Sequence, residues 1–458
     1  MTHNAVTLLT LAALSFSGGA AGFWLAQHDL GPAAMVRSRA VAADWRGRKL
    51  GYMLVISFVA ILMTASSLYA EPVSRSPPGA TVQELLALVR KFNPELAAAA
   101  LDTEAAIAKI LPAGSLDDPM VNVTRDQGFL NTVSTISQEF PLWGKLDLRA
   151  GVASAMARAT KGQQDSVQTQ LEERLKIVFA QYYAADRAIT VTHDIHGLLH
   201  AVADTARARY AQGVVNQSDV IRAELEQARL DTDLAKLEES RESAKAKINA
   251  LIARSAAAPL AGPKSLRKVP AVSALPLPVL VGKARERNPK LSSARAEIAG
   301  AEGERKLVDR SWYPDVTVTA GNDSLPGTGL NFVGGVGLKV PLQWGVRDAQ
   351  AQAATAKKGA AQLRLDAELF NIESELKSAL AMLNQAQRTG NLLRTTLGPQ
   401  SEAAYNSTLT SYQVGLGDLT SVLDAAHKRF EIQVEILNNE TEAQTALAAI
   451  ERLVGGDL

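Results

Sequence analysis

The sequence predicts a mainly α-helical protein with four β-strands, arranged as two similar halves. Three observations lead to this fold class. Short motifs return in the same order after 195, 200 and 202 residues, each half contains two short strand-like segments, and each half contains a helical stretch of unusual length. A period of about 200 residues is too long for a solenoid unit and indicates two copies of a whole structural half.

Three pairs of short motifs define this repeat. They are Asn93-Pro94-Glu95-Leu96 with Asn288-Pro289-Lys290-Leu291, Phe140-Pro141-Leu142-Trp143-Gly144 with Val340-Pro341-Leu342-Gln343-Trp344-Gly345, and Tyr210-Ala211-Gln212-Gly213 with Tyr412-Gln413-Val414-Gly415. The two predicted repeats therefore occupy residues 81–258 and 278–458. An N-terminal linker at 71–80 precedes them, and a proline-rich linker at 259–277 joins them.

Residues 1–70 form a leader region that ends in a signal peptide. A basic front and an apolar stretch at 52–63 precede Leu68-Tyr69-Ala70, which fits a signal-peptidase cleavage site. A second apolar stretch at 5–26 fits either a transmembrane helix or a start codon assigned too far upstream. We favour the upstream start, with Met35 as the true one. Under either interpretation, we expect the protein to be exported from the cytoplasm.

The composition excludes several classes of protein. The net charge is only +1, so a nucleic-acid surface is not expected, and the lack of cysteine excludes disulfides, thiolate metal sites and a lipidated N-terminal cysteine. The sequence has no phosphate-binding glycine loop, no G-x-S-x-G elbow and no zinc-ligand spacing. We therefore expect neither an enzyme nor a cofactor, and the energy for any transport must come from a partner.

The first repeat begins with a helix and a β-hairpin. Thr81-Val82-Gln83-Glu84 is a capping box that opens a helix extending to about residue 110, where Leu111-Pro112 ends it. Residues 120–125 alternate apolar and polar side chains, and residues 132–140 are rich in β-branched side chains. These two segments predict a pair of strands joined by a turn.

A long helical hairpin follows the strands. The 69 residues from 143 to 211 contain no proline and would span about 100 Å as one helix, at about 1.5 Å per residue. Gly213 and Asn216 end this helix, and a return helix is predicted at about 218–254.

The second repeat follows the same plan. Its predicted elements are a helix at 278–311, strands at 316–320 and 332–340 around a turn-rich loop at 322–329, and helices at 346–413 and 419–454. Gly398-Pro399 interrupts the longer helix, and Gly197 occupies the equivalent place in the first repeat. Kinks are therefore expected at both positions.

These elements cannot complete a fold within one chain. The strands have about 8 to 11 residues each, which suits tilted membrane-spanning strands, but four strands are too few to close a barrel and would leave unpaired edges. Three copies would supply twelve strands. The apolar stripes of the long helices also need neighbours, so the sequence predicts a β-barrel that continues as a helical tunnel.

The ordered motifs resemble the TolC family of outer-membrane efflux proteins over about residues 80–457. The segment from Gln138 to Lys145, with Phe140-Pro141-Leu142-Trp143-Gly144 at its centre, is most similar to the CzcC/CusC cation-efflux branch. The resemblance implies a homotrimer in which four strands per protomer form a 12-stranded β-barrel, continued by a long α-helical barrel. It also implies an outer-membrane location with a long periplasmic extension.

The resemblance further implies an exit duct for heavy-metal cations that works with a periplasmic adaptor protein and an inner-membrane RND pump. A drug-efflux or type I secretion duct of the same architecture is the first alternative, because the pump selects most of the cargo. A periplasmic coiled-coil scaffold without a pore is the second alternative. It predicts a protein without channel conductance.

The turns of the two helical hairpins form the first candidate site. Their residues are small or apolar, namely Gly213, Val214, Val215, Gly415, Leu416 and Gly417. Helix ends that require glycine would explain the glycines by geometry alone. The resemblance implies that these turns also meet the adaptor protein. An arginine that the family often has near the second turn is Gly417 here.

Acidic residues near the same turns form the second candidate site. Asp219 and Asp418 stand where a carboxylate stabilises the start of a helix, which is sufficient to explain them. The resemblance implies gating roles for both, with Asp424 as a threefold ring at the pore constriction and Tyr412 pairing with Asp219 to hold the closed state. Ser421 replaces a second aspartate that the family often has, which would weaken the ring.

Two further groups of residues are candidates. Three histidines share one helical face and could hold a divalent metal, although we favour a solvated helix surface: His193, His196 and His200. Four aromatic residues lie at strand–helix junctions, where they would form an interfacial girdle or simply pack the junctions: Trp143, Trp312, Tyr313 and Trp344.

Overall fold

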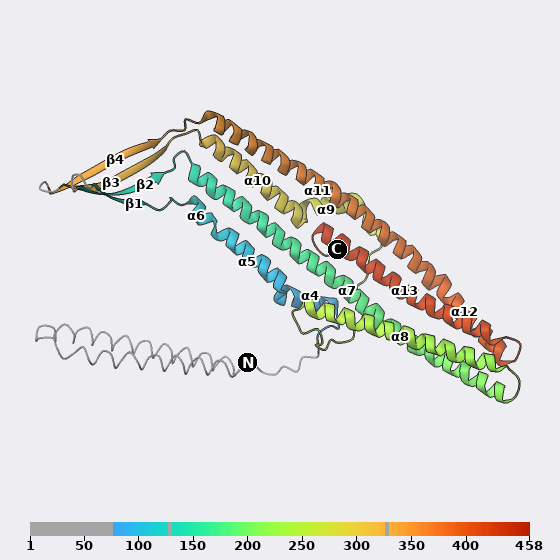
Figure 1. Cartoon of the computed structure of the whole chain (residues 1–458). Coiled ribbons are helices and arrows are strands. Elements are labelled where there is room, and N and C mark those ends of the chain that lie inside the picture. The colour runs from blue at the N-terminus through green and yellow to red at the C-terminus, as the bar shows by residue number, and fades with distance from the viewer. Residues whose placement is uncertain (1–76, 127–130, 326–328) are drawn as a thin grey trace, which may run out of the picture. The chain divides into compact units, whose positions relative to one another are not determined.

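The computed structural model describes residues 77–126, 131–325 and 329–458 (Figure 1). These residues belong to one compact unit, Ser76–Leu458. The predicted leader at 1–70 and the turn at 127–128 lie outside the described residues. Within the described ranges, no helix combines the length and the apolar character needed to cross a membrane.

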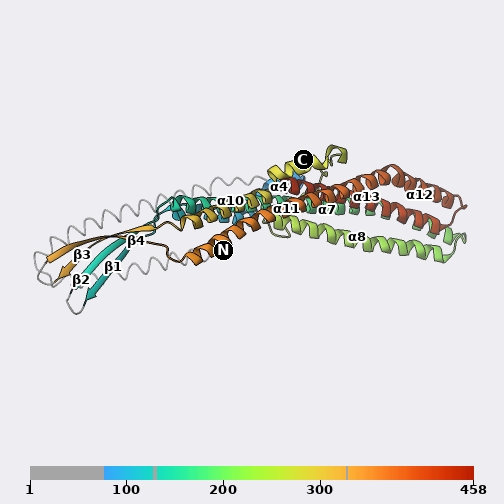
Figure 2. The ribbon, with the colours of Figure 1, turned by 90° about the horizontal axis from the view of Figure 1, so that it is seen from above.

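The secondary structure of the described residues confirms the prediction of a mainly helical fold with four strands. The elements in chain order are α4 (Val82–Phe92), α5 (Pro94–Ala108), α6 (Ile110–Gly114), β1 (Met120–Asp126), β2 (Asn131–Phe140), α7 (Lys145–Ala211), α8 (Gln217–Leu251), η2 (Val272–Ala274), α9 (Leu277–Arg287), α10 (Pro289–Arg310), β3 (Asp315–Leu325), β4 (Gly329–Lys339), α11 (Trp344–Leu392), η3 (Leu393–Leu397), α12 (Gly398–Gln413) and α13 (Leu419–Val454). The sheet lies at one end of the unit, and the α7–α8 and α12–α13 turns lie at the other (Figures 1 and 2).

The four strands form one antiparallel sheet in the order β1-β2-β3-β4. The central pair is β2 and β3, whose register runs from Phe140 opposite Val316 to Thr132 opposite Ser324. β1 and β4 are the edges, because each pairs on one side only among the described residues. The sheet therefore joins a strand from each half of the sequence at its centre and leaves two edges free.

The second hairpin differs from the prediction at its turn. β3 continues to Leu325, so the loop predicted at 322–329 is wrong over its first residues. Asn322 pairs with Ser134 of β2 on one side and with Phe332 of β4 on the other. Pairing on both sides satisfies its backbone groups and overrides the turn tendency of the residue type.

The two long helical stretches also differ from the prediction. α7 has 67 residues and is continuous past Gly197, so the kink predicted there is not accompanied by a break in the helix. In the second half, the π-helix η3 separates α11 from α12 just before Pro399. Pro399 has no N–H to donate to the Thr395 carbonyl, and a wider turn before it accommodates the lost bond. Glycine alone imposes no such constraint.

The Asn-Pro motifs divide two helices that the sequence analysis predicts as continuous. The Asn93 side chain accepts hydrogen bonds from the Glu95 and Leu96 amides and so starts α5. Asn288 starts α10 in the same way. Proline suits the first position of each new helix because the missing N–H would have no partner there.

Each of these asparagines also binds the end of a distant helix. Nδ2 of Asn93 donates to the Leu251 carbonyl, and Nδ2 of Asn288 donates to the Leu453 carbonyl, both at 2.8 Å. Both asparagines are buried, at 6% and 4% exposure. The same side chain therefore begins one helix and satisfies a carbonyl at the end of another.

The core is divided into three apolar clusters along the helices. One lies near the turns and includes Leu199, Tyr405 and Val422. A second packs α9 against α11 and α13, and a third packs α4 against α7 and α8. Small residues allow the closest helix approach, since a Cβ on Gly162 would lie 2.8 Å from the Ser293 amide nitrogen. The helices are thus held side by side along their length.

Replacing Asn288 with alanine should lower the free energy of unfolding by about 1–3 kcal/mol, because a helix cap is lost and the Leu453 carbonyl loses its partner. Thermal unfolding followed by circular dichroism in detergent measures the change. Asn406→Ala is the matched control, since Asn406 is exposed on α12 and its side chain has no hydrogen bond among the described residues. Equal melting temperatures for the two variants would contradict the role of Asn288.

Candidate functional site

The two hairpin turns have the same backbone geometry. Gly213 has φ +73° and Gly415 has φ +82°, the left-handed conformation that favours glycine. The amide following each glycine donates back across the helix end, from Val214 to the Arg209 carbonyl and from Leu416 to the Ser411 carbonyl, both at 2.9 Å. Both glycines are therefore explained by helix termination.

The turns expose apolar side chains to their surroundings. Val214 is 61% exposed, Val414 64% and Leu416 87%. Val215 is half-buried. Gly417 is closely packed, because a Cβ there would lie 3.1 Å from the Tyr412 amide nitrogen. The residues that were predicted as small and apolar thus form a tight turn in each hairpin. Each turn exposes apolar side chains at the end of its hairpin.

Basic residues of the first hairpin hold the two turns together. The Arg209 guanidinium of α7 lies 4.8 Å from the centre of the Tyr412 ring and donates to the Gln413 carbonyl at 3.4 Å. Arg222 of α8 donates to the Thr420 hydroxyl of α13 at 2.6 Å. The sequence analysis missed both arginines, because their partners lie about 200 residues away in the sequence and no local pattern marks them.

The acidic residues near the turns have different surroundings. Asp418 is the N-cap of α13, and its Oδ1 accepts from the Ser421 amide at 3.2 Å. Hydrogen bonds from Ser421 hold the pKa of the Asp418 carboxyl below its usual value. Asp219 is half-buried in the first turn of α8. Asp424 is exposed on α13 and forms no ion pair among the described residues.

Tyr412 is one of the most buried side chains near the turns. It is 2% exposed, and its hydroxyl has no hydrogen-bond partner in the described part of the chain. The ring packs in the cluster that includes Ala206, Leu419 and Val422. Its predicted pairing with Asp219 involves a hydroxyl that this packing covers, and it stays a prediction.

The three histidines are not brought together as a metal site. His196 lies 3.5 Å from Asp231, and His200 lies 3.0 Å from Asp204, each measured between side-chain nitrogen and oxygen. His193 is exposed. Across the described ranges, no group of three or more His, Asp or Glu side chains is arranged to hold a metal ion.

The strand–helix junction is built around an aromatic pair and a buried lysine. The Trp143 and Tyr313 ring centres are 5.2 Å apart, and Trp143 Nε1 donates to the Pro314 carbonyl at 3.2 Å. Lys145 is 5% exposed, and its Nζ lies 2.7 Å from Asp315 Oδ1 and 2.9 Å from the Tyr313 carbonyl oxygen. The segment that follows β2 is thereby fixed to the segment that precedes β3.

The remaining aromatic candidates at this level are exposed, as Trp143 and Tyr313 also are. Trp312 is 38% exposed and Trp344 is 66% exposed. The sequence analysis found the aromatic residues but missed Lys145 as their buried partner. In the sequence, only the position of Lys145 directly after Trp143-Gly144 indicated that it belongs to this junction.

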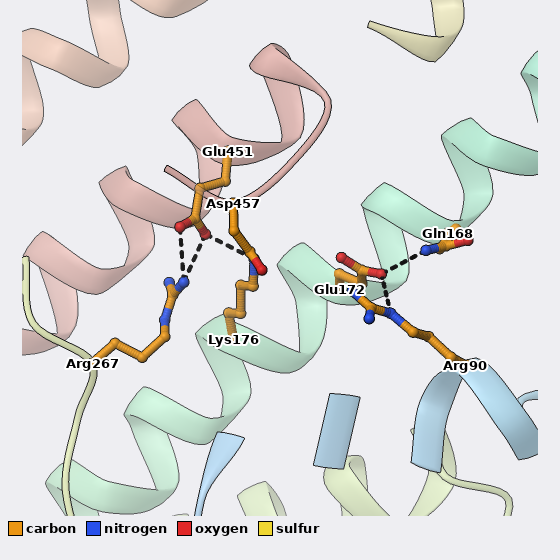
Figure 3. Close-up of polar contacts among 7 residues, drawn as sticks. All are labelled: Arg90, Gln168, Glu172, Lys176, Arg267, Glu451 and Asp457. Carbon is orange, nitrogen blue, oxygen red and sulfur yellow. Dashed lines mark hydrogen bonds and ion pairs between the residues drawn. The ribbon is translucent and has the colours of Figure 1, made fainter. Parts of the chain in front are cut away.

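A buried charged network links the helices midway along the unit (Figure 3). Glu451 of α13 accepts from Lys176 of α7 at 2.8 Å and from Arg267 at 2.8 Å. Lys176 and Glu451 are only 5% and 4% exposed. Asp457 also binds Lys176, at 2.6 Å, and this hydrogen bond lowers the pKa of the Asp457 carboxyl. Charge compensation allows these groups to be buried.

A second ion pair on α7 adjoins this network. Glu172 accepts from Arg90 of α4 at 2.8 Å and from Gln168 at 2.9 Å (Figure 3). The Glu172 bond raises the pKa of the Arg90 guanidinium. Sequence reasoning missed both groups of charges, since Lys176 and Glu451 are separated by 275 residues and only the folded chain brings them together.

Solved structures place this fold among outer-membrane channels. A crystal structure of CusC aligns with a TM-score of 0.71 at 15% identity, covering 84% of this chain and 96% of that one. The outer membrane protein VceC from Vibrio cholerae aligns with a TM-score of 0.71 at 18% identity, covering 82% of this chain and 96% of that one. The fold is therefore that of the TolC-family channels.

Sequence comparison gives a family match over part of the chain and a relative. Residues 280–456 match the family described as outer membrane efflux protein. The cobalt-zinc-cadmium resistance protein CzcC of Cupriavidus metallidurans is 23% identical over 379 residues, which is 82% of this chain and 90% of the relative. Residues 280–456 thus match an outer membrane efflux protein domain, and the resemblance of the chain to the TolC family and the CzcC/CusC branch is confirmed.

Glu451→Ala should lower the free energy of unfolding by about 3 kcal/mol, because Lys176 and Arg267 lose their shared buried partner. Chemical denaturation of the full chain in detergent measures the difference. Glu442→Ala, at an exposed position of α13 with no ion pair among the described residues, is the matched control. A Glu451→Ala variant as stable as the control would show that the network adds nothing to stability.

Proposed function

We propose that this chain is the outer-membrane exit duct of a tripartite RND-type efflux system that exports heavy-metal cations. The observation that carries the proposal is the 23% identity to CzcC over 90% of that protein, whose name describes cobalt-zinc-cadmium resistance. The TolC-family channel fold supports the duct, and the relative supports the cargo. Transport is passive in this chain and is driven by the inner-membrane pump.

The duct is a homotrimer with a 12-stranded β-barrel. A sheet in lipid must pair both edges, and β1 and β4 each have a free one among the described residues. Three protomers with four strands each supply an even number large enough to close. Apolar side chains on the edge strands support a lipid-facing surface, since Val121 and Val123 are each 67% exposed, Phe332 83% and Val336 73%.

The helices of the three protomers form a tunnel in the periplasm. Large apolar side chains stand exposed on the helices of one protomer, including Leu101 of α5 at 65%, Leu363 of α11 at 71% and Phe370 of α11 at 72%. Neighbouring protomers bury these side chains in the assembled trimer. The two repeats of each protomer then alternate around the tunnel and give it pseudo-sixfold symmetry.

The hairpin turns dock a periplasmic adaptor protein. Val214, Val414 and Leu416 supply exposed apolar contacts at the ends of the two hairpins. The backbone geometry of Gly213 and Gly415 presents both ends in the same form. An adaptor with apolar residues on its own hairpins would bury these side chains on contact.

The tunnel mouth is gated by acidic residues. Asp424 is exposed on α13 and has no ion pair among the described residues, so its charge is available to the pore. Three copies around the axis attract cations and repel one another when the pore narrows. Asp418 is occupied in capping α13 and contributes charge beside this ring.

Drug-efflux and type I secretion ducts remain the competing functions, because the same fold serves channels with different pumps. Gene neighbours distinguish them: an inner-membrane heavy-metal pump supports metal export, whereas an ATP-driven secretion transporter supports the alternative. A scaffold without a pore would give no ion conductance in planar bilayers. Detergent-stable trimers that conduct ions would exclude the scaffold.

Deletion of the gene should sensitise the cells to divalent heavy-metal cations, and the intact chain should restore resistance. Growth inhibition measured ion by ion, with a panel of drugs in parallel, tests cargo and function together. Leu416→Asp should abolish the rescue because it places a charge in the docking surface, whereas Leu416→Met should retain it. Sensitivity to drugs alone would refute the metal cargo.

Asp424→Asn should weaken the block of the reconstituted channel by divalent cations at least about threefold, because three carboxylates leave the constriction together. Single-channel conductance in planar bilayers, with calcium or zinc added, measures the block. Asp102→Asn is the matched control, as Asp102 is exposed on α5 far along the chain from the turns. Unchanged block in Asp424→Asn would remove this residue from the pore.

A further inference from the structure

We propose that the end of β4 in one protomer is fixed to the start of β1 in the next by ion pairs from Lys339 and Arg347 to Asp117 and Asp118. The inference rests on the proposed trimeric barrel and specifies which side chains close it. The partner is a second copy of this chain, and the contact is made on the helical side of the sheet.

A contact of the same kind is present inside the protomer, at the junction of β2 and β3. Where β2 meets β3, the segment after β2 supplies Trp143 and Lys145, the segment before β3 supplies Tyr313 and Pro314, and the first residue of β3 is Asp315. Lys145 lies 2.7 Å from Asp315, and Trp143 donates to the Pro314 carbonyl. The backbone hydrogen bonds between β2 and β3 are thus followed by side-chain contacts that hold the two segments together.

The junction of β4 with a neighbour's β1 is the next junction of this kind. Adjacent strands in the sheet are antiparallel, so the end of β4 meets the start of the neighbour's β1. At that end, the segment after β4 contains Trp344 and Arg347, and the segment before β1 contains Asp117 and Asp118. Both junctions thus have a basic residue after one strand and an acidic residue at the start of the next strand or just before it.

The stagger of the sheet brings these two segments to the same level. In the observed register, Met120 of β1 is level with Ser137, Thr319 and Gly335, and β4 continues from there to Lys339. From β1 to β4 the strand ends advance by four residues in all, three from β1 to β2, one from β2 to β3 and none from β3 to β4. A neighbouring β1 that starts level with the end of β4, as β3 does, has its Met120 beside Lys339.

The charges of the two segments are complementary, and only Lys339 forms an ion pair within the described part of one protomer. Asp117 and Asp118 are exposed and form no ion pair among the described residues, and the same holds for the half-buried Arg347. Lys339 has one exposed partner, Glu139, at 3.3 Å. The Asp117 carbonyl accepts from a β2 side chain, Gln138, at 2.7 Å, which keeps the acidic segment close to the sheet.

A cavity of about 440 Å³ lies where the basic segment leaves the sheet. Lys339, Arg347, Lys145 and Arg149 line it, and its one carboxylate, Asp315, is bound by Lys145. Such an excess of positive charge also fits the phosphate of an anionic phospholipid. The neighbouring chain is the better occupant, because the free edge of β4 must be paired at the same place.

Charge reversal tests the contact in the full chain. Asp117→Lys with Asp118→Lys, and separately Lys339→Asp with Arg347→Asp, should each raise the apparent dissociation constant of the detergent-solubilised trimer at least about tenfold, because like charges then meet at each interface. Combining all four changes should restore most of the affinity. Native mass spectrometry across a dilution series measures the trimer, and Asp102→Lys on the exposed face of α5 is the control.

Cross-linking provides a second measurement that does not depend on stability. The chain contains no cysteine, so an Asp118→Cys, Lys339→Cys variant has only the two introduced thiols. A short bismaleimide should join protomers into covalent dimers and trimers on a denaturing gel. A variant with Asp102→Cys and Lys339→Cys should remain monomeric there.

The outcomes separate this inference from the proposed function. A parent chain that forms no trimer overturns the trimeric duct and this contact with it. Parent trimers that tolerate Asp117→Lys with Asp118→Lys, or that fail to recover in the combined variant, overturn the contact alone. The same holds if only Lys339→Asp with Arg347→Asp has an effect and it also removes binding to phosphatidylglycerol vesicles, since the cavity then holds lipid phosphate.

Discussion

The pairing of β2 with β3 is the interaction on which the rest of the described unit depends. It joins strands from the two halves of the sequence, and each strand is continuous with a long helix, α7 after β2 and α10 before β3. The Lys145–Asp315 pair fixes the point where these helices leave the sheet. Since α7 begins and α10 ends at this point, the two helices lie side by side, and small residues such as Gly162 allow the close approach.

The parts of the fold that the sequence predicted are those that one local residue enforces. The absence of proline predicted the length of α7, and the glycines at 213 and 415 predicted both turns because only glycine adopts their backbone angles easily. The parts that it missed depend on distant partners. Asn322 continues a strand because neighbours pair on both sides, and the role of Asn93 in starting a new helix is reinforced by a carbonyl near residue 251.

The candidate site divides in the same way. The exposed turns were predicted from composition, whereas Arg209, Lys145 and the Lys176–Glu451 pair were not, since nothing in the neighbouring sequence marks their partners. The buried charges also have a structural meaning. Each is compensated in only one arrangement of α7, α13 and the linker that carries Arg267, so the network specifies the relative position of these segments more than it strengthens them.

The π-helix η3 is related to a difference in length between the two repeats of the chain. Gly144 and Tyr210 are 66 positions apart, whereas their counterparts Gly345 and Tyr412 are 67 positions apart. A single inserted residue would rotate every later side chain of an α-helix by about 100° and turn its buried face outward. A π-turn absorbs about one additional residue without that rotation. The one-residue difference between the halves therefore coincides with η3, which lies between Gly345 and Tyr412 and can accommodate the additional residue within the helix.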